Sequence, residues 1–106
     1  MSTEELPPIY QRLKAQHPDY LAAVEKLGAT VREAGPIDEK TGHLIQLAAA
    51  ASNRSEGSVH SHVRRALAAG ASEAEIRHAL LLLTSTIGFP TVAAALSWAD
   101  DILKQG

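Results

Sequence analysis

The sequence predicts an all-α fold, a compact bundle of about six helices that assembles into homo-oligomers. Apolar residues recur at spacings of three and four, proline and glycine separate the segments with this pattern, and no segment alternates in the manner of a strand. Only 4% of the 106 residues are aromatic, so leucine, isoleucine, valine and alanine must fill the core. Such side chains favour close packing of helices over a β-sandwich.

Start and stop signals mark the first four expected helices. Proline opens the first two, over residues 8–16 and 18–34, and Gly35–Pro36 ends the second. Asp38 is expected to cap a third helix that runs to about residue 53. A fourth follows a short loop and ends before Gly70.

The fifth helix carries a prediction about assembly. Ser72 and Glu75 form a capping box for it, Gly88 is expected to end it, and Phe89–Pro90 opens a sixth helix. Within the fifth helix, the run Ala79–Leu83 covers every direction around the axis. A small chain can hardly bury such a helix on all sides, so we expect it to meet another subunit. A central core helix in a monomer is the alternative.

Length and composition limit the classes of protein to which the chain can belong. The chain is short enough for one domain, expected at residues 17–106 after an N-terminal tail and short helix at residues 1–16. A net charge of −2 argues against nucleic acid as a partner, and the absence of cysteine excludes disulfides and thiolate chemistry. The longest apolar run cannot span a membrane and Met1–Glu5 lacks an apolar signal core, which predicts no membrane partner and a cytoplasmic protein.

The densest polar cluster is Asn53–His62, at the entrance of the fourth helix. Ser58 and His62 are four residues apart and share a helix face, and His62 borders the apolar stripe. A partly buried imidazole there can exchange a proton near neutral pH, with Glu56 in reach if the helix starts favourably. The alternative is that Glu56 and Ser58 decorate the helix N-terminus and His62 is a satisfied histidine at the core edge.

The histidines also raise the question of a metal. His60 and His62 lie about 200° apart on an ideal helix, which does not suit one ion. A set of His43, Glu56, His60 and His62 from two helices matches no zinc motif. We therefore expect no metal site and no cofactor, and metal-assisted catalysis by these histidines stays a third hypothesis.

Four stretches, at residues 40–48, 55–70, 72–77 and 88–91, together resemble the carboxymuconolactone decarboxylase family, which includes the alkylhydroperoxidase D-like proteins. The most telling combination is His62, an Ala-Leu helix end, Ala-Gly-Ala-Ser, an acidic capping turn, an aliphatic helix and Gly-Phe-Pro. The likeness runs from about Tyr20 to Leu103. It implies an alkylhydroperoxidase D-like domain over residues 17–106 that forms dimers, trimers or hexamers.

The peroxidase branch of that family carries a Cys-x-x-Cys pair, with a histidine four residues after it and a glutamate twelve residues before it. The corresponding positions here are Ser55, Ser58, His62 and His43, so the histidine is kept while both sulfurs and the glutamate are replaced. A serine hydroxyl cannot cycle through a disulfide, and this redox mechanism is therefore unavailable to the chain. A peroxidase or antioxidant function would therefore be suggested by the family name alone and not by the residues of this chain.

The decarboxylase branch lacks the Cys pair and keeps a Glu-x5-His arrangement, which Glu56 and His62 match here. The resemblance implies a cofactor-free decarboxylase, or a related lyase or isomerase, that acts on a small organic acid or lactone. His62 would protonate carbon or stabilise the anion, and Glu56 would orient it. The residues expected to contact the substrate are Ser55, Ser58, His60, His43 and Arg54, and either Arg54 or Arg64 is expected to bind its carboxylate. A non-catalytic ligand-binding or assembly protein of the same family is the alternative.

Overall fold

The computed structural model describes residues 7–104, and within this range it contains helices and turns without a strand. The all-α prediction is confirmed. The chain divides into two compact units, Met1–Pro36 and Ile37–Gly106, each described here by itself. The expected N-terminal tail, residues 1–6, lies outside the described residues. None of the helices within residues 7–104 is both long and apolar enough to cross a membrane.

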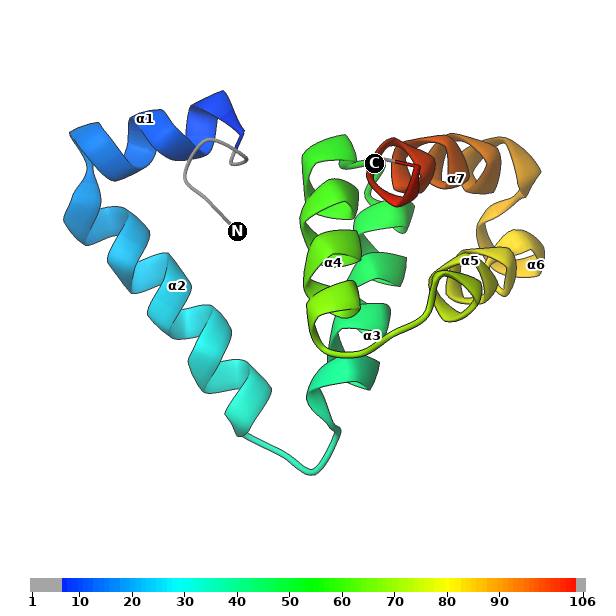
Figure 1. Cartoon of the computed structure of the whole chain (residues 1–106), viewed down its shortest axis with the longest axis horizontal. Helices are drawn as coiled ribbons and strands as arrows, with labels where there is room; N and C mark the ends of the chain where they lie inside the picture. The colour runs from blue at the N-terminus through cyan, green and yellow to red at the C-terminus, as the bar shows by residue number, and fades with distance from the viewer. Residues whose placement is uncertain (1–6, 105–106) are drawn as a thin grey trace. The chain divides into compact units, whose positions relative to one another are not determined.

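The first unit holds two helices, α1 (Pro8–Gln16) and α2 (Pro18–Glu33), which pack against each other (Figure 1). Each begins with proline in its first turn, as predicted, because this position needs no backbone N–H. The Tyr10 hydroxyl donates to Glu25 Oε2 at 2.6 Å and joins the two helices. Leu21 is buried, whereas Leu27 and Val31 on the same apolar stripe are 63% and 52% exposed.

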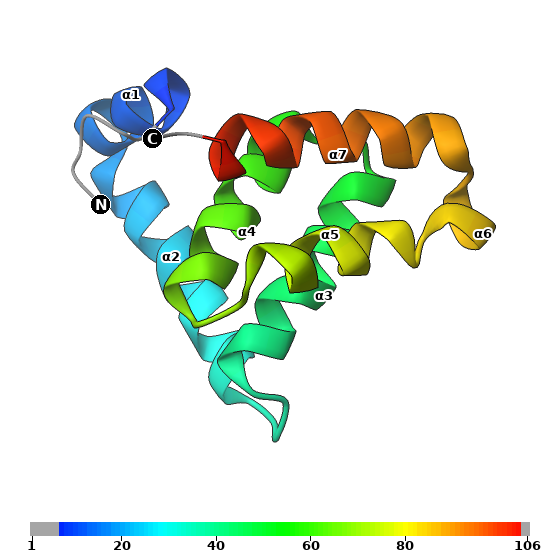
Figure 2. The ribbon, with the colours of Figure 1, turned by 45° about the vertical axis from the view of Figure 1, so that its right-hand side comes forward.

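The second unit holds α3 (Glu39–Ser52), α4 (Glu56–Ala68), α5 (Glu73–Leu81), the single turn α6 (Thr84–Ile87) and α7 (Phe89–Leu103). The helices α3 and α4 form an antiparallel pair, and α5 and α7 pack across it (Figure 2). Buried core side chains come from α3 (Leu47, Ala50, Ala51), α4 (Val59, Val63, Ala66), α5 (Ile76, Leu80) and α7 (Ala95, Ala99), with Ala71 from the α4–α5 loop. Six of these eleven residues are alanine, which lets the helices approach closely, as the composition predicted.

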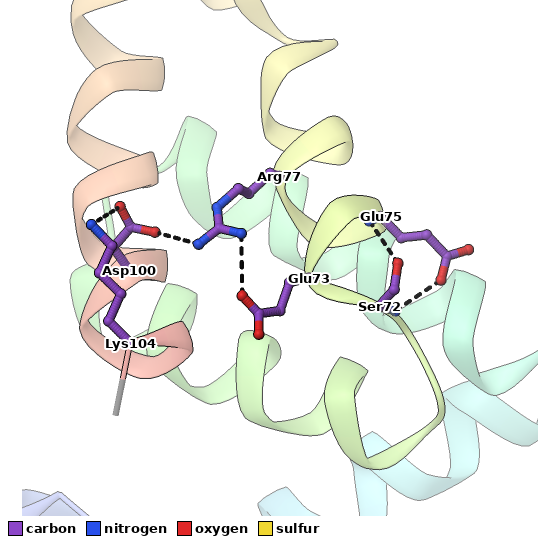
Figure 3. Close-up of polar contacts among 6 residues, drawn as sticks. All are labelled: Ser72, Glu73, Glu75, Arg77, Asp100 and Lys104. Atoms are coloured by element: carbon purple, nitrogen blue, oxygen red, sulfur yellow. Dashed lines mark hydrogen bonds and ion pairs between the residues drawn. The ribbon is translucent and has the colours of Figure 1, made fainter. Parts of the chain in front are cut away.

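The predicted caps are confirmed. Asp38 Oδ1 accepts the backbone N–H of Thr41 at 2.7 Å at the start of α3. At the start of α5, Ser72 Oγ accepts the backbone N–H of Glu75 at 3.0 Å, and Glu75 Oε1 accepts that of Ser72 at 2.9 Å (Figure 3). The bond from the Ser72 backbone and, next to it, a bond from Lys40 Nζ to Glu75 Oε2 at 3.1 Å hold the pKa of Glu75 below its usual range. The capping contacts satisfy helix N–H groups that would otherwise lack a partner.

The prediction of one continuous fifth helix to Gly88 is wrong. The helix α5 ends at Leu81, and α6 follows after two turn residues. At this point the Leu83 N–H bonds to the carbonyl of Leu80 three residues back, at 3.1 Å, so the turn is tighter than an α-helix. The Thr84 hydroxyl donates to the Leu81 carbonyl at 2.8 Å, which satisfies an acceptor at the helix end. Gly88, with φ of 92°, ends α6 instead.

The division into two compact units falls between Pro36 and Ile37, so α2 belongs to the first unit. The domain limits expected from the sequence, residues 1–16 and 17–106, stay a prediction. The Gly35–Pro36 signal that ends α2 therefore also marks the change from one unit to the other.

An ion-pair network joins α5 to α7 within the second unit. Arg77 donates to Glu73 Oε1 at 3.2 Å and to Asp100 Oδ1 at 3.0 Å, and Lys104 Nζ lies 3.4 Å from Asp100 Oδ2 (Figure 3). The hydrogen bond from Arg77, assisted by Lys104, holds the pKa of Asp100 below its usual range. The same pairing raises the pKa of Arg77. The network fixes the C-terminal half of α7 against the start of α5.

This network predicts a dependence of stability on pH. Because the native pKa of Asp100 is lowered, the unfolded chain binds more protons in acid than the native chain does. The stabilisation is therefore complete near neutral pH and is lost as the pH falls below about 4. We expect Asp100→Asn to make the fall of the unfolding free energy in acid shallower, as measured by urea unfolding across a pH series. Glu33→Gln, an exposed carboxylate of α2, is the control, and equal acid slopes in wild type and Asp100→Asn would contradict the assignment.

Candidate functional site

The polar cluster predicted at the start of α4 follows a sharp reversal of the chain. The backbone N–H groups of Arg54 and Ser55 bond to the carbonyls of Ala51 and Ala50 at 3.0 Å each, which is the hydrogen-bond pattern of a Schellman C-cap on α3. Arg54 occupies the left-handed position of this motif, with φ of 55°. Glycine usually fills that position, because a side chain there costs about 1–2 kcal/mol. The surrounding structure must therefore compensate the cost of the left-handed backbone at Arg54.

The Arg54 side chain reaches α7. Its Nη2 donates to Thr91 Oγ1 at 3.0 Å, and Thr91 is a buried residue in the first turn of α7. This bond uses one of the five guanidinium N–H donors and fixes the direction of the group. The remaining donors can bind a carboxylate in a bidentate manner. The prediction that Arg54 binds a substrate carboxylate stays a prediction, and Thr91 is the residue that would orient it.

The structure brings two of the predicted site histidines together. His43 on α3 and His62 on α4 have ring centroids 5.8 Å apart, with the planes tilted by 38°. His43 is buried, at 3% exposure, and His62 is half-buried beside the core residues Val59 and Val63. Glu39 Oε1 lies 3.8 Å from Nε2 of His43. Buried His43 is thus close to both an exposed carboxylate and a half-buried second imidazole.

Glu56 lies on another face of α4. Its carboxylate, His60 and Asp101 of α7 present ligand atoms that all lie within 4.8 Å of one another. His60 Nε2 is 2.9 Å from Asp101 Oδ2. Six residues of an ideal helix turn through about 600°, so Glu56 and His62 project in different directions. The structure therefore groups Glu56 with His60, and groups His62 with His43.

The two predicted site serines lie at the start of α4. Ser55 is the N-cap residue, but its hydroxyl makes no capping hydrogen bond, which leaves it for other partners. Ser58 is half-buried, one turn before His62 on the same face. Both therefore remain candidates for contact with a ligand that reaches His62 from the N-terminal end of α4.

A groove of about 380 Å³ lies between α3 and α5. It is mostly apolar, and its residues are Thr41, Leu44, Ile45, Ala48, Glu75, His78, Ala79, Leu82 and Leu83. Its size is that of a small-molecule pocket. Neither histidine of the pair lines it, so the groove and the His43–His62 pair are two separate features of the second unit.

Three residues near the site were missed from the sequence. Thr91 supports Arg54, Glu39 faces His43, and Asp101 faces His60. Only Glu39 carries a local signal, because it precedes His43 by one helical turn. For Asp101 the sequence contains no such signal, because nothing in it places this residue near a histidine 41 positions away.

Comparison with known protein families matches residues 18–101 to the carboxymuconolactone decarboxylase family. The match covers α2 to α7 except for the last residues of α7. No curated protein matches the chain.

Proposed function

The chain belongs to the carboxymuconolactone decarboxylase family, and from this premise we propose that it is a cofactor-free lyase or isomerase acting on a small organic acid or lactone. The observation that carries the proposal is the ring contact between half-buried His62 and buried His43. Imidazole is the side chain best suited to exchange protons near neutral pH. With no cysteine in the chain, thiol-dependent reduction of hydroperoxides has no nucleophile.

In the proposed decarboxylation, the bond between the substrate carboxylate and its carbon breaks and carbon dioxide leaves. The electron pair passes into the conjugated carbonyl as a dienolate. Protonated His62 then donates its proton to carbon and becomes neutral, and solvent restores the proton. His43 is the positioning residue, because its ring lies against His62 and keeps a second face of the imidazole away from water. A lactone isomerisation would use the same ring first as base and then as acid.

Arg54 is the proposed anchor for the substrate carboxylate. The strained backbone at φ of 55° and the bond to Thr91 both fix its guanidinium. Ser55 and Ser58 supply hydroxyls at the same end of α4. In this proposal Glu56 contributes to the polar entrance and His43 takes the orienting role that the sequence suggested for Glu56, because Glu56 is grouped with His60.

A thermal-shift screen of small carboxylic acids and lactones tests the substrate class. A ligand present at a hundred times its dissociation constant stabilises the native state by about 2.7 kcal/mol, which raises the melting temperature by several degrees. A shift that is smaller in His62→Gln than in wild type and unchanged in His78→Gln supports the proposed site. A shift lost only in His78→Gln moves the ligand to the α3–α5 groove, which His78 lines, and overturns the proposal.

A thermal shift lost only in His78→Gln would support a non-catalytic function. The groove favours it as the alternative, because an apolar hollow of this size with a few polar groups is typical of a ligand site. In that case the bound compound is recovered unchanged after long incubation with the protein. Product formation by wild type separates the two functions.

We also propose that the chain is a homo-oligomer. In α5 and the following turn, Leu81 and Leu82 are 52% and 63% exposed, and the α2 stripe of Val24, Leu27 and Val31 is exposed as well. Apolar side chains gathered on helix faces in this way mark surfaces that other subunits cover. The exposure of Leu81 and Leu82 fits the prediction made from the run Ala79–Leu83.

The α2 stripe gives a direct test of assembly. Leu27→Asp places a charge in the stripe, and we expect it to reduce the mass of the particle to that of a smaller assembly or a monomer, as measured by size-exclusion chromatography with light scattering. Ala22→Asp is the matched control, because Ala22 is exposed and lies about 140° around the helix from Leu27. If Leu27→Asp lowers stability while the mass stays that of wild type, the stripe is not a contact between subunits.

A further inference from the structure

We propose a binding site for a divalent transition-metal ion, with Zn²⁺ as the representative, formed by Glu56, His60 and Asp101. The three residues present ligand atoms within 4.8 Å of one another. They are separate from the His43–His62 pair, so the inference does not rest on the proposed reaction. It replaces the expectation from the sequence that the chain has no metal site.

The donor set has the chemistry of such an ion. One imidazole nitrogen and two carboxylate oxygens are ligands that Zn²⁺ and its neighbours in the first transition row accept, whereas Ca²⁺ and Mg²⁺ prefer oxygen alone. Three protein ligands also leave a fourth position open for water or an exogenous ligand. The carboxylates of Glu56 and Asp101 give the cluster a local negative charge that attracts a cation.

Rigid packing holds the three side chains near one another. Glu56 and His60 are one turn apart on α4, so they share a face. Asp101 comes from α7, which packs on α4 (Figure 2). Val59 and Val63 of α4 and Ala99 of α7 belong to the same buried core. The side chain of His60 is only 22% exposed, which limits its rotamers. Sites built on packed helices are better preorganised than sites on loops.

The distances require only small rearrangements. In a tetrahedral zinc site with bonds of about 2.1 Å, the ligand atoms lie about 3.4 Å apart. His60 Nε2 and Asp101 Oδ2, at 2.9 Å, must separate slightly, and the ligand atoms that lie up to 4.8 Å apart must approach. Glu56 is exposed and can move, and no hydrogen bond or ion pair ties it to another of the residues 7–104. Arg64 follows His60 by one turn, and its charge opposes a cation, so we expect micromolar affinity.

Isothermal titration of the full chain with Zn²⁺, and absorption spectroscopy with Co²⁺, test the site. We expect one ion per chain and a visible Co²⁺ band of a four-coordinate site. His60→Gln and Asp101→Asn should each weaken binding at least tenfold and remove the band. The matched control, His17→Gln, changes an exposed histidine in the first unit and should bind as wild type does.

Circular dichroism confirms that each variant is folded before it is titrated. Equal Zn²⁺ binding by wild type and His60→Gln would overturn the proposal, as would a wild-type protein that binds no ion at micromolar concentration. In the second case the contact between His60 and Asp101 serves only as a hydrogen bond between α4 and α7. Activity of the protein toward organic acids enters neither readout, so failure of this proposal and failure of the proposed function are distinguishable.

Discussion

Leu80→Ala is expected to lower the free energy of unfolding by about 2–5 kcal/mol, the usual range for removing a fully buried leucine. Leu80 has no exposed surface and lies in the core that joins α5 to α3 and α7. Its truncation removes apolar contacts and leaves a cavity that packed helices fill only in part. A domain of this size has about 5–15 kcal/mol of stability in total, so the loss brings it near its limit. Urea unfolding followed by circular dichroism measures the change.

The neighbouring residue supplies the control. Leu81→Ala makes the same chemical change on the same helix, but Leu81 is 52% exposed in the single chain. We expect it to cost little when unfolding is measured on dissociated subunits at low protein concentration. At high concentration its cost should grow if a second subunit covers Leu81. Equal losses of unfolding free energy for Leu80→Ala and Leu81→Ala at every concentration would contradict this prediction. They would show that burial in the single chain does not determine the cost of truncating the leucine.

The contrast between these two leucines shows where reasoning from sequence stops. Helix starts depend on local chemistry, so Asp38 and the Ser72–Glu75 pair could be recognised as caps from the sequence. The end of α5 has no such signal, because neither proline nor glycine stands near Leu81, and a threonine hydroxyl with two tight turns ends the helix instead. Periodicity identified the apolar faces but does not distinguish a face that the chain buries from one that a partner covers.

The same limit applies to the site. His62 was recognised as a candidate site residue because it borders an apolar stripe one turn from Ser58. Its neighbour His43 lies on the preceding helix, α3. The contacts between Arg54 and Thr91 and between His60 and Asp101 join residues 37 and 41 positions apart. Such contacts depend on how α7 packs on α4, and the residue patterns in the sequence do not predict this packing. For this reason the sequence paired Glu56 with His62 by spacing, whereas the fold places Glu56 beside His60.

His62→Gln is expected to lower kcat by about 10²–10⁴-fold for the acid or lactone identified by the thermal-shift screen, because it removes the proton donor while it keeps a polar side chain of similar length. The wild-type rate should depend on pH, because only the protonated ring can donate the proton. His43→Gln should cause a smaller loss, since His43 contacts the ring of His62 and is itself buried away from solvent. Steady-state rates across a pH series measure all three.

The controls for this experiment separate catalysis from folding. His17→Gln should keep the wild-type rate, since His17 is exposed between α1 and α2 in the first unit. The screened ligand should raise the melting temperature of His62→Gln, which keeps Arg54, by less than that of wild type. The reason is that the His62 ring also contributes contact surface to the ligand. Full activity of folded His62→Gln would remove the imidazole from the reaction. Since the chain has no cysteine, a protein still active without His62 would need its proton from Glu39, His43 or solvent, and the pH dependence of the remaining rate would show which group supplies it.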